Sequence, residues 1–401
     1  MNTDIEWLFE AVYKKQRESP DSTLYFLSDW DCDVYTDIKF KILLEDSYSD
    51  AQSHSFNYLF AYEQFDLKQQ IIDFFKTSYQ LSIPENCLTI SPSATQAIYL
   101  GLKALKNLNI KRYLIFTPAY FSTFESLKEN NGFIYYYHLV DKDGFAINFS
   151  MLEQVIKEQF IECIVLTDPV FSAGLEFPDD DYDRIITLVV RYDLYLFIDY
   201  SLGGLKWNFN ELSVLNNKKV GKLIKTAKFI FVDSLSKRLQ LNGIKFSLIL
   251  GDANIVDEID TISEGIYGGL NHIQISILRK LYTQENSPTI LDMHKVQLGK
   301  IKANYRLIQS MLIGENFHLP KSNSGYFTII SHDSKSFNDI NTKEIILNLL
   351  QNEQIIAIPN NHFSYYSDNK FGWRINLTKN QDELLIALQK CIRKIFGGLN
   401  H

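Results

Sequence analysis

The chain has 401 residues, of which 46% are hydrophobic and 22% charged, a balance that is typical of soluble globular proteins and excludes an intrinsically disordered chain. Its 48 acidic and 40 basic side chains give a net charge of −8, which argues against a nucleic-acid partner because phosphates require a basic face. The length predicts two or three domains.

Two patterns of apolar residues alternate between about residues 66 and 250. Spacings of three and four residues predict helices within 67–75, 97–105 and 152–156. Nearly continuous apolar runs between them are typical of strands covered on both faces, and they occur at 113–116, 133–137, 161–166, 194–198, 229–232 and 246–250. Alternating strands and helices predict an α/β fold with a mostly parallel sheet.

The pattern of apolar residues changes after about residue 285. We predict helices at 293–311 and 343–352, strands at 325–330, 355–358 and 373–377, and a last helix that Asn380 caps. This pattern indicates a smaller α+β domain. We therefore expect an N-terminal segment (1–44) that joins the small domain, a large α/β domain (45–285) and the small C-terminal domain (286–401).

Polar side chains follow the apolar runs at the points where the strands should end. Thr167 and Asp168 come after one run, Asp199 after the next, and Lys237 shortly after another. Because ligand groups gather at the carboxyl ends of parallel strands, we expect these residues to share one edge of the sheet. A lysine that lies partly buried near carboxylates is a candidate for Schiff-base chemistry.

The segment around this lysine resembles the cofactor-lysine segment of class I/II aminotransferases, which use pyridoxal 5′-phosphate (PLP). The resemblance implies the aspartate aminotransferase fold. Here it reads Ser234-Leu-Ser236-Lys237, followed by Gly243-Ile-Lys245. The resemblance implies that Lys237 is the Schiff-base lysine and that Ser234, Ser236 and Lys245 bind the cofactor. Lys245 stands where the family usually has an arginine, so it keeps the charge but loses the bidentate fork.

Other segments resemble the family in the same order along most of the chain. Ser93, Ala94 and Thr95 open a predicted helix and resemble the phosphate-binding turn, where free N–H groups attract an anion. The resemblance implies that Tyr120 stacks on the pyridine ring. It also implies that Asp199 pairs with the ring nitrogen and keeps it protonated.

Two more motifs of the resemblance concern the substrate and the assembly. Arg374, in Trp373-Arg-Ile-Asn-Leu377, resembles the arginine that binds the substrate carboxylate. Tyr58 resembles the tyrosine that reaches the phosphate of the neighbouring subunit, which implies a homodimer. The expected activity is therefore transamination between an amino acid and a 2-oxo acid, and the side-chain pocket is expected around residues 30–36.

Two positions depart from the family. Phe171 and Leu202 stand where an asparagine and a tyrosine usually donate to the phenolic oxygen of PLP. Tyr200 or Ser201 could supply the missing donor through a local shift. The departures leave two alternatives open: another PLP reaction, such as elimination, cyclisation or oxidation, or a non-catalytic homologue that uses this fold as a binding module.

The sequence does not name the amino acid, and it offers little sign of other chemistry. There is no CxxC, HExxH or comparable metal-ligand spacing, so no metal is expected. The four scattered cysteines are typical of reduced thiols. No apolar run approaches the ~18 residues of a membrane span. We therefore expect a cytoplasmic protein without membrane contact.

Overall fold

The computed structural model describes residues 5–32, 38–60, 64–140, 144–207, 217–312, 317–332, 342–363 and 371–396. Its larger part is built on a seven-stranded sheet with the spatial order β2-β8-β7-β6-β5-β3-β4. The strands are β2 (Leu88–Ser91), β3 (Arg112–Thr117), β4 (Phe133–His138), β5 (Cys163–Thr167), β6 (Tyr195–Tyr200), β7 (Lys228–Asp233) and β8 (Ser247–Gly251).

The sheet is mixed but mostly parallel. Strand β8 pairs antiparallel with both β2 and β7, and the remaining pairs are parallel, so β8 alone runs against the others. The carboxyl ends of β2, β3, β5, β6 and β7 therefore meet at one edge. The predicted α/β fold with a mostly parallel sheet is confirmed.

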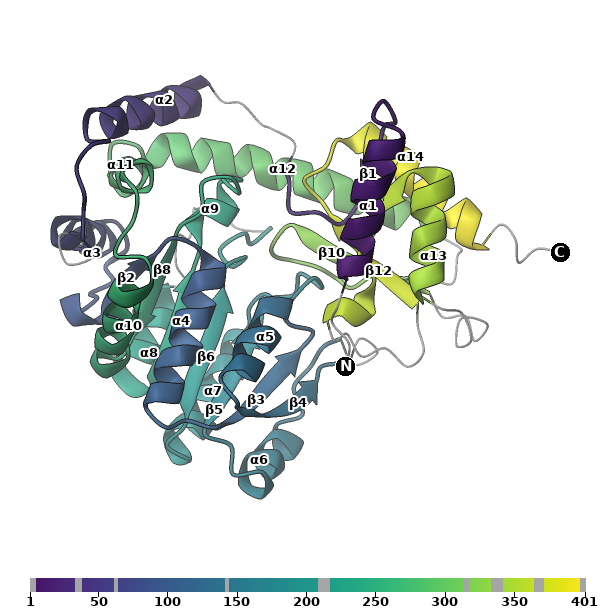
Figure 1. Ribbon diagram of the computed structural model, residues 1–401. Helices are drawn as coiled ribbons and strands as arrows, with labels where there is room; N and C mark the ends of the chain where they lie inside the picture. Colours follow the sequence, from purple (N-terminus) through teal and green to yellow (C-terminus); the bar gives the residue numbers. More distant parts are fainter. Residues whose placement is uncertain are drawn as a thin grey trace.

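Helices cover both faces of this sheet (Figure 1). One face packs against α4 (Ala94–Asn107), α5 (Phe121–Glu129) and α10 (Ala253–Ile266). The other face packs against α3 (Phe65–Tyr79), α6 (Phe149–Glu158), α7 (Asp179–Arg191) and α8 (Asn217–Thr226). Because successive residues of a strand point to opposite faces, each core takes alternate residues of the same strands.

The remaining helices of the larger part lie above the sheet edge. The short helix α9 (Leu235–Arg238) follows β7, and α2 (Ile38–Ser53) packs against α11 (His272–Leu281) (Figure 1). The close approach of α4 to β6 depends on Gly101, since a Cβ there would lie 2.7 Å from the Phe197 ring. The glycine therefore allows α4 to pack directly against the sheet.

The smaller part is α+β. An antiparallel sheet joins β9 (Phe317–His318), β10 (Phe327–His332) and β12 (Phe371–Asn376), and a parallel pair joins β1 (Tyr25–Phe26) to β11 (Ile355–Ile356). The helices of this part are α1 (Glu6–Glu18), α12 (Ser287–Met311), α13 (Thr342–Asn348) and α14 (Gln381–Phe396).

Helix α12 connects the two parts (Figure 1). Its first half contributes Ile290 and Met293 to the core of the larger part, whereas Leu298 and Ile301 belong to the core of the smaller part. The N-terminal helix α1 shares this second core through Leu8 and Val12. The exact domain limits at 44/45 and 285/286 stay predictions.

Some elements of the smaller part differ from the prediction. Helix α12 begins six residues earlier than predicted, at Ser287, with a proline in its first turn. Proline is well tolerated there because the first N–H groups of a helix lack a partner within it. The predicted helix 343–352 is α13 continued by a π-helical turn, Leu349–Glu353. In the ranges that the structure describes, no helix is both long and apolar enough to cross a bilayer.

Candidate functional site

A pocket opens at the carboxyl edge of the large sheet. It lies where β5 and β6 end, beside the beginnings of α4 and α5 and next to α9. Its lining residues are Trp30, Ala94, Thr95, Ile98, Tyr120, Thr167, Phe171, Asp199, Ser201, Leu202 and Lys237. Five of the residues predicted to bind the cofactor or to react are therefore brought together: Ala94, Thr95, Tyr120, Asp199 and Lys237.

Strand alternation decides which polar residues reach this pocket. Asp199 and Thr167 are paired neighbours on β6 and β5, and both face the side of the sheet that α4 covers. Tyr200 and Asp168 come one residue later and point to the opposite face. The polar residues expected at this edge therefore divide between two faces of the sheet.

Asp199 is a buried acid at the floor of the pocket, 4% exposed. Burial raises the pKa of its carboxyl, while hydrogen bonds from the hydroxyl and the backbone N–H of Ser201 (N···Oδ1 3.0 Å) oppose this shift. The nearby Lys237 ammonium also favours the ionised form. Ser201 thus supports Asp199, a role that the resemblance did not indicate.

Lys237 extends from α9 into the same pocket. Burial lowers the pKa of its amine to about 8, against an opposing effect of Cys32, and the positive charges of Lys245 and Arg374 lower it further. A substantial fraction of the amine is therefore neutral just above neutral pH. Only the neutral form is nucleophilic, so Lys237 suits covalent chemistry.

The first turn of α4 forms another wall of the pocket. Ser93 is the N-cap, and its hydroxyl oxygen accepts a hydrogen bond from the Gln96 N–H (3.1 Å). Ala94 and Thr95 follow and line the pocket. Because the first N–H groups of a helix have no partner within the helix, this end of α4 offers an anion-binding position.

Arg374 comes from β12 of the smaller part and is fully buried. Its Nε donates to the carbonyl oxygen of Ser28 (3.1 Å), and its Nη2 donates to the same oxygen. The guanidinium lies 4.1 Å from the centre of the Phe327 ring and 4.7 Å from that of Trp30. Burial lowers the pKa of this guanidinium to about 9, so it remains charged at neutral pH.

Trp30 joins Arg374 to the pocket. Its indole also lies 4.5 Å from the Lys237 ammonium and packs edge-on against Tyr120, with ring centres 5.6 Å apart. The sequence indicated only that residues 30–36 would contribute to a side-chain pocket, and residues 33–36 lie outside the described ranges. The motif around Lys237 does not indicate a role for Trp30, which is far away in the sequence.

The other predicted site residues lie outside the lining of the pocket. Ser234 and Ser236 are buried, and both hydroxyls donate to the Phe246 carbonyl (3.1 and 3.2 Å). Lys245 is exposed. Tyr58 is 69% exposed, and its hydroxyl lies against Gly268 instead of the pocket of its own chain. Their roles toward a cofactor stay predictions.

The two departures from the family pattern both face the pocket. Phe171 and Leu202 line it with hydrocarbon side chains. Tyr200 does not compensate, because it points to the far face of the sheet and accepts a hydrogen bond from the Gly204 N–H (3.0 Å). The Ser201 hydroxyl lines the pocket but is directed to Asp199.

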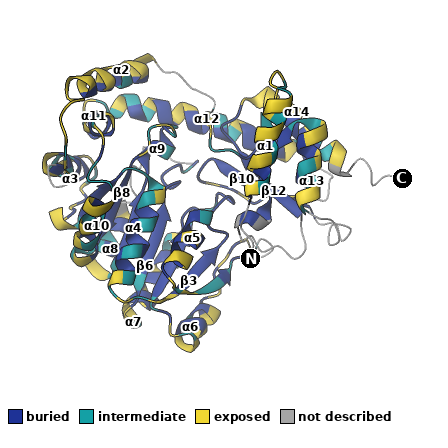
Figure 2. Cartoon of the chain, viewed as in Figure 1, coloured by how far each residue is buried: buried dark blue, intermediate teal, exposed yellow. Residues whose placement is uncertain are grey.

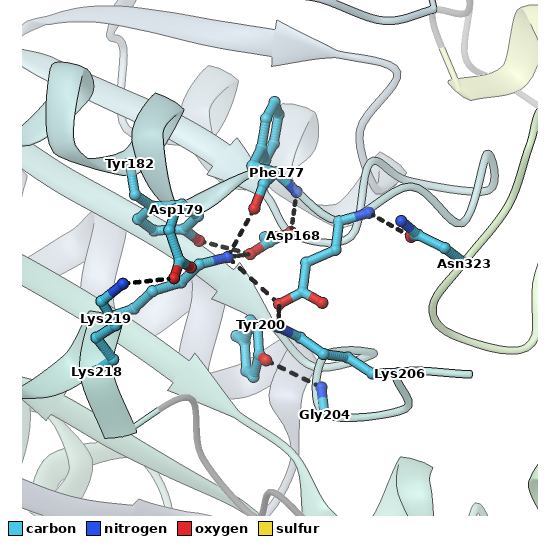
Figure 3. A network of polar contacts seen from close by, with 11 residues as sticks. Asp168, Phe177, Asp179, Tyr182, Tyr200, Gly204, Lys206, Lys218, Lys219 and Asn323 are labelled. Carbon is cyan, nitrogen blue, oxygen red and sulfur yellow. Dashed lines mark hydrogen bonds and ion pairs between the residues drawn. The ribbon is translucent and has the colours of Figure 1, made fainter. Parts of the chain in front are cut away.

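A buried polar network around Asp168 and Lys219 lies on the far face of the sheet, where the chain leaves β5 (Figure 3). The Lys219 ammonium donates to Asp168 Oδ2 (3.1 Å), Glu176 Oε1 (3.3 Å) and the Phe177 carbonyl (2.9 Å). Tyr182 donates to the same Asp168 oxygen (2.7 Å). Asp168 therefore anchors the loop after β5 from below and does not take part in the pocket.

No cluster of three or more metal-ligating side chains occurs in the part of the chain that the structure describes. Among the described residues that line the pocket, Lys237 is the one cation and Asp199 the one anion. The pocket thus combines an amine, a carboxylate, a helix N-terminus and several aromatic rings.

Comparisons with known proteins identify the family of this chain. The model of the family "aminotransferase class I and II" matches residues 39–390. An aspartate aminotransferase from Sulfolobus acidocaldarius is 20% identical over 319 residues, which is 78% of this chain and 76% of the relative. One from Pyrococcus horikoshii is 19% identical over 83% of this chain and 81% of its own length.

Solved structures show the same fold at low identity. A double mutant of Thermus thermophilus aspartate aminotransferase superposes with a TM-score of 0.81 at 15% identity, covering 98% of this chain and 97% of that chain. An aromatic aminotransferase from Pyrococcus horikoshii gives 0.79 at 15% identity, covering 96% of this chain and 99% of that chain. The fold is that of aspartate aminotransferase, as the sequence predicted, and the chain belongs to the class I and II aminotransferase family.

Proposed function

We propose that this protein is a PLP-dependent aminotransferase that acts on an amino acid and a 2-oxo acid through Lys237. The family is PLP-dependent. The observation that carries the proposal is the convergence of the Lys237 amine and the buried Asp199 carboxylate on one pocket beside the N-terminus of α4. This arrangement favours the proposal over a non-catalytic binding module.

The residues present fit the chemical groups of PLP. A phosphate suits the free N–H groups at Ala94 and Thr95, a pyridine nitrogen suits the Asp199 carboxylate, and an aldehyde suits the Lys237 amine. The ring of Tyr120 offers a flat apolar wall. When bound, PLP supplies an aldehyde that bonds to amines and a ring that accepts electron density from the α carbon of an amino acid.

The chain's own residues supply positioning and proton transfer. Arg374, held by the Ser28 carbonyl, binds the α-carboxylate of the amino acid. Asp199, supported by Ser201, keeps a negative charge beside the ring nitrogen. Lys237 Nζ removes the proton from the α carbon of the amino acid, holds it and donates it again in a later step of the exchange. The lowered pKa of Lys237 makes this proton transfer effective near neutral pH.

A two-stage experiment tests this function. The protein is incubated with PLP and reduced with borohydride, and its peptides are weighed; a phosphopyridoxyl adduct is expected on Lys237, and the Lys245→Ala variant should carry the same adduct. The unreduced protein is then given an amino acid and a 2-oxo acid. Formation of the exchanged pair is expected. Absence of the adduct at Lys237 contradicts the proposal.

The product analysis also separates the alternative PLP reactions. Phe171 and Leu202 offer no donor to the phenolic side of the cofactor, which keeps a specialised reaction of the same cofactor open as a second candidate. Elimination would release ammonia from the amino acid without requiring the 2-oxo acid. Transamination instead leaves aminated cofactor after a single turnover.

We also propose that the protein is a homodimer. Several large apolar side chains between residues 38 and 65 are exposed, and they are Ile38, Ile42, Tyr48, Phe56, Tyr58, Phe60 and Phe65. Much of α2 is exposed in Figure 2. A concentration of exposed apolar residues of this kind is typical of a protein–protein interface.

Placing a charge in this surface should separate the subunits. Sedimentation of the wild-type protein at micromolar concentration is expected to show a dimer. Ile42→Asp should raise the dimer dissociation constant by at least about tenfold, because a carboxylate would be desolvated in an apolar contact. Tyr13→Asp, on an exposed aromatic residue of α1, is the control and should leave the dimer intact. A monomeric wild-type protein would refute the assembly.

A further inference from the structure

The Trp30 side chain contacts both Lys237 and Arg374. In the proposed function, these two cations bind the nitrogen and the carboxylate of the amino acid. The centre of the Trp30 indole lies 4.5 Å from the Lys237 Nζ and 4.7 Å from the Arg374 Cζ. An α-amino acid that directs its nitrogen to Lys237 and its carboxylate to Arg374 must place its α carbon between these two groups. Its side chain therefore begins next to the indole.

The segment that carries Trp30 is fixed from both parts of the molecule. Asn242, in the loop after α9, donates to the Trp30 carbonyl (2.7 Å). On the opposite side, the Asn376 amide at the end of β12 donates to the carbonyls of Asp29 (3.2 Å) and Asp31 (2.8 Å). These hydrogen bonds hold the backbone on both sides of the indole, so its position is built into the site.

Trp30 is the centre of an aromatic wall. Its ring packs edge-to-face against Phe327 (4.9 Å between centres) and Tyr120 (5.6 Å), and it is tilted against Phe171 (6.2 Å). Rings in such arrangements attract a further aromatic ring. Phe171 and Phe327 have no polar atom, and the faces of all four rings carry negative potential, so a second carboxylate against these faces would lose hydration, with only the Trp30 N–H and the Tyr120 hydroxyl as donors at their edges.

The two cations that contact the indole are already assigned to the two ends of the amino acid. Arg374 serves its α-carboxylate and Lys237 its nitrogen, and the described lining contains no further cation. We propose that Trp30 determines the substrate side chain: the site accepts α-amino acids with uncharged, preferably aromatic, side chains and discriminates against aspartate and glutamate. This inference rests on the proposed function for the roles of Lys237 and Arg374.

Turnover of two amino acids tests the inference in the PLP-loaded protein. With one 2-oxo acid, kcat/KM is expected to be at least about tenfold higher for phenylalanine than for aspartate. Trp30→Ala should reduce this ratio by about tenfold, whereas Trp30→Phe, which keeps an aromatic ring, should preserve most of it. A wild-type protein that prefers aspartate, or a Trp30→Ala variant that slows both substrates by the same factor, overturns the inference.

A binding measurement gives a second readout that does not depend on turnover. Calorimetry with 3-phenylpropionate and succinate compares an aromatic monocarboxylate with a dicarboxylate, and neither has an amino group that can react. The wild-type protein should bind 3-phenylpropionate at least about tenfold more tightly, and Trp30→Ala should remove this difference. Equal binding of the two acids, or binding of neither, refutes the inference. If no amino acid is turned over, the proposed function fails, but this comparison still decides the role of Trp30.

Discussion

Replacing Lys219 by methionine is expected to lower the free energy of unfolding by about 3–5 kcal/mol at pH 7, the cost typical of removing one partner from a buried ion pair. The Lys219 side chain is 2% exposed and contacts two carboxylates, Asp168 (0% exposed) and Glu176 (7%). Methionine fills a similar volume but leaves these two acids facing each other, with Lys206 as the remaining cation near Glu176. Chemical denaturation of the cofactor-free protein measures the loss.

The neighbouring lysine of the same helix is a matched control. Lys218 also pairs with an aspartate, Asp179 (2.8 Å), but both side chains are exposed, so Lys218→Met should change the stability little. A loss of under about 1 kcal/mol for Lys219→Met would contradict its assigned role, since removing a buried charge partner costs several times more.

The pH dependence of the Lys219→Met variant provides an independent check. Burial and the charge of Asp168 raise the pKa of Glu176, and Lys219 opposes this shift, so the variant should raise it further. A carboxyl whose pKa is raised by folding destabilises the fold above that pKa and ceases to do so once it is protonated in both states. The difference in free energy of unfolding between the wild-type protein and the Lys219→Met variant should therefore become smaller as the pH falls from 7 toward 4.

Much of the fold could be predicted because the strands of the large sheet are short apolar runs without competing signals. The six runs predicted between residues 113 and 250 correspond to β3 through β8. Strand β2 was not predicted, because the four residues Leu88–Ser91 form no continuous apolar run and their partner β8 is distant in sequence. Helix α7 was also missed, although three aspartates in its first turn are typical of a helix start.

Only those site residues that belong to short local motifs could be predicted from the sequence. Lys237, Asp199 and Thr95 each lie at the end of a strand or the start of a helix, and the structure places all three around one pocket. Asp168 was expected at the same edge as Asp199. Strand alternation places it on the opposite face, because Thr167 is the residue in register with Asp199.

Contacts between distant segments could not be predicted from single motifs. The hydrogen bond between Asn242 and the carbonyl of Trp30 joins residues 212 positions apart. The Lys219–Asp168 pair joins residues 51 positions apart, on a helix and a loop that share no sequence pattern. Both depend on the packing of whole elements, so neither the residue type nor its immediate neighbours indicated them.

The opposite effect on stability is expected when Lys237, the lysine of the pocket, is replaced. Lys237→Met should raise the free energy of unfolding of the cofactor-free protein at pH 7 by about 1–3 kcal/mol, the range that a pKa shift of this size implies. Within the described part of the chain, the Lys237 ammonium has no ion-pair partner, and it lies near the like charges of Lys245 and Arg374. Folding therefore buries this charge at a cost, and methionine removes the cost.

The pH profile gives the sign of this effect. Folding lowers the pKa of Lys237 from 10.5 to about 8. Below pH 8 the amine is charged in both states, so the full penalty is present; between pH 8 and 10.5 the unfolded state binds more protons, and the wild-type protein gains stability as the pH rises. The advantage of Lys237→Met should therefore be constant below pH 8 and shrink toward zero near pH 10.5.

Denaturation of both proteins at a series of pH values measures this difference, with any bound PLP removed beforehand. Lys76→Met, at an exposed position of α3, is the control and should change the free energy of unfolding little at any pH. A Lys237→Met variant that is less stable than the wild type at pH 7 would mean that the ammonium has favourable partners in the fold. Such partners would keep the amine protonated near neutral pH and would remove the physical reason for its reactivity. The stability of this variant thus tests, without any substrate, whether the pocket prepares Lys237 as a nucleophile.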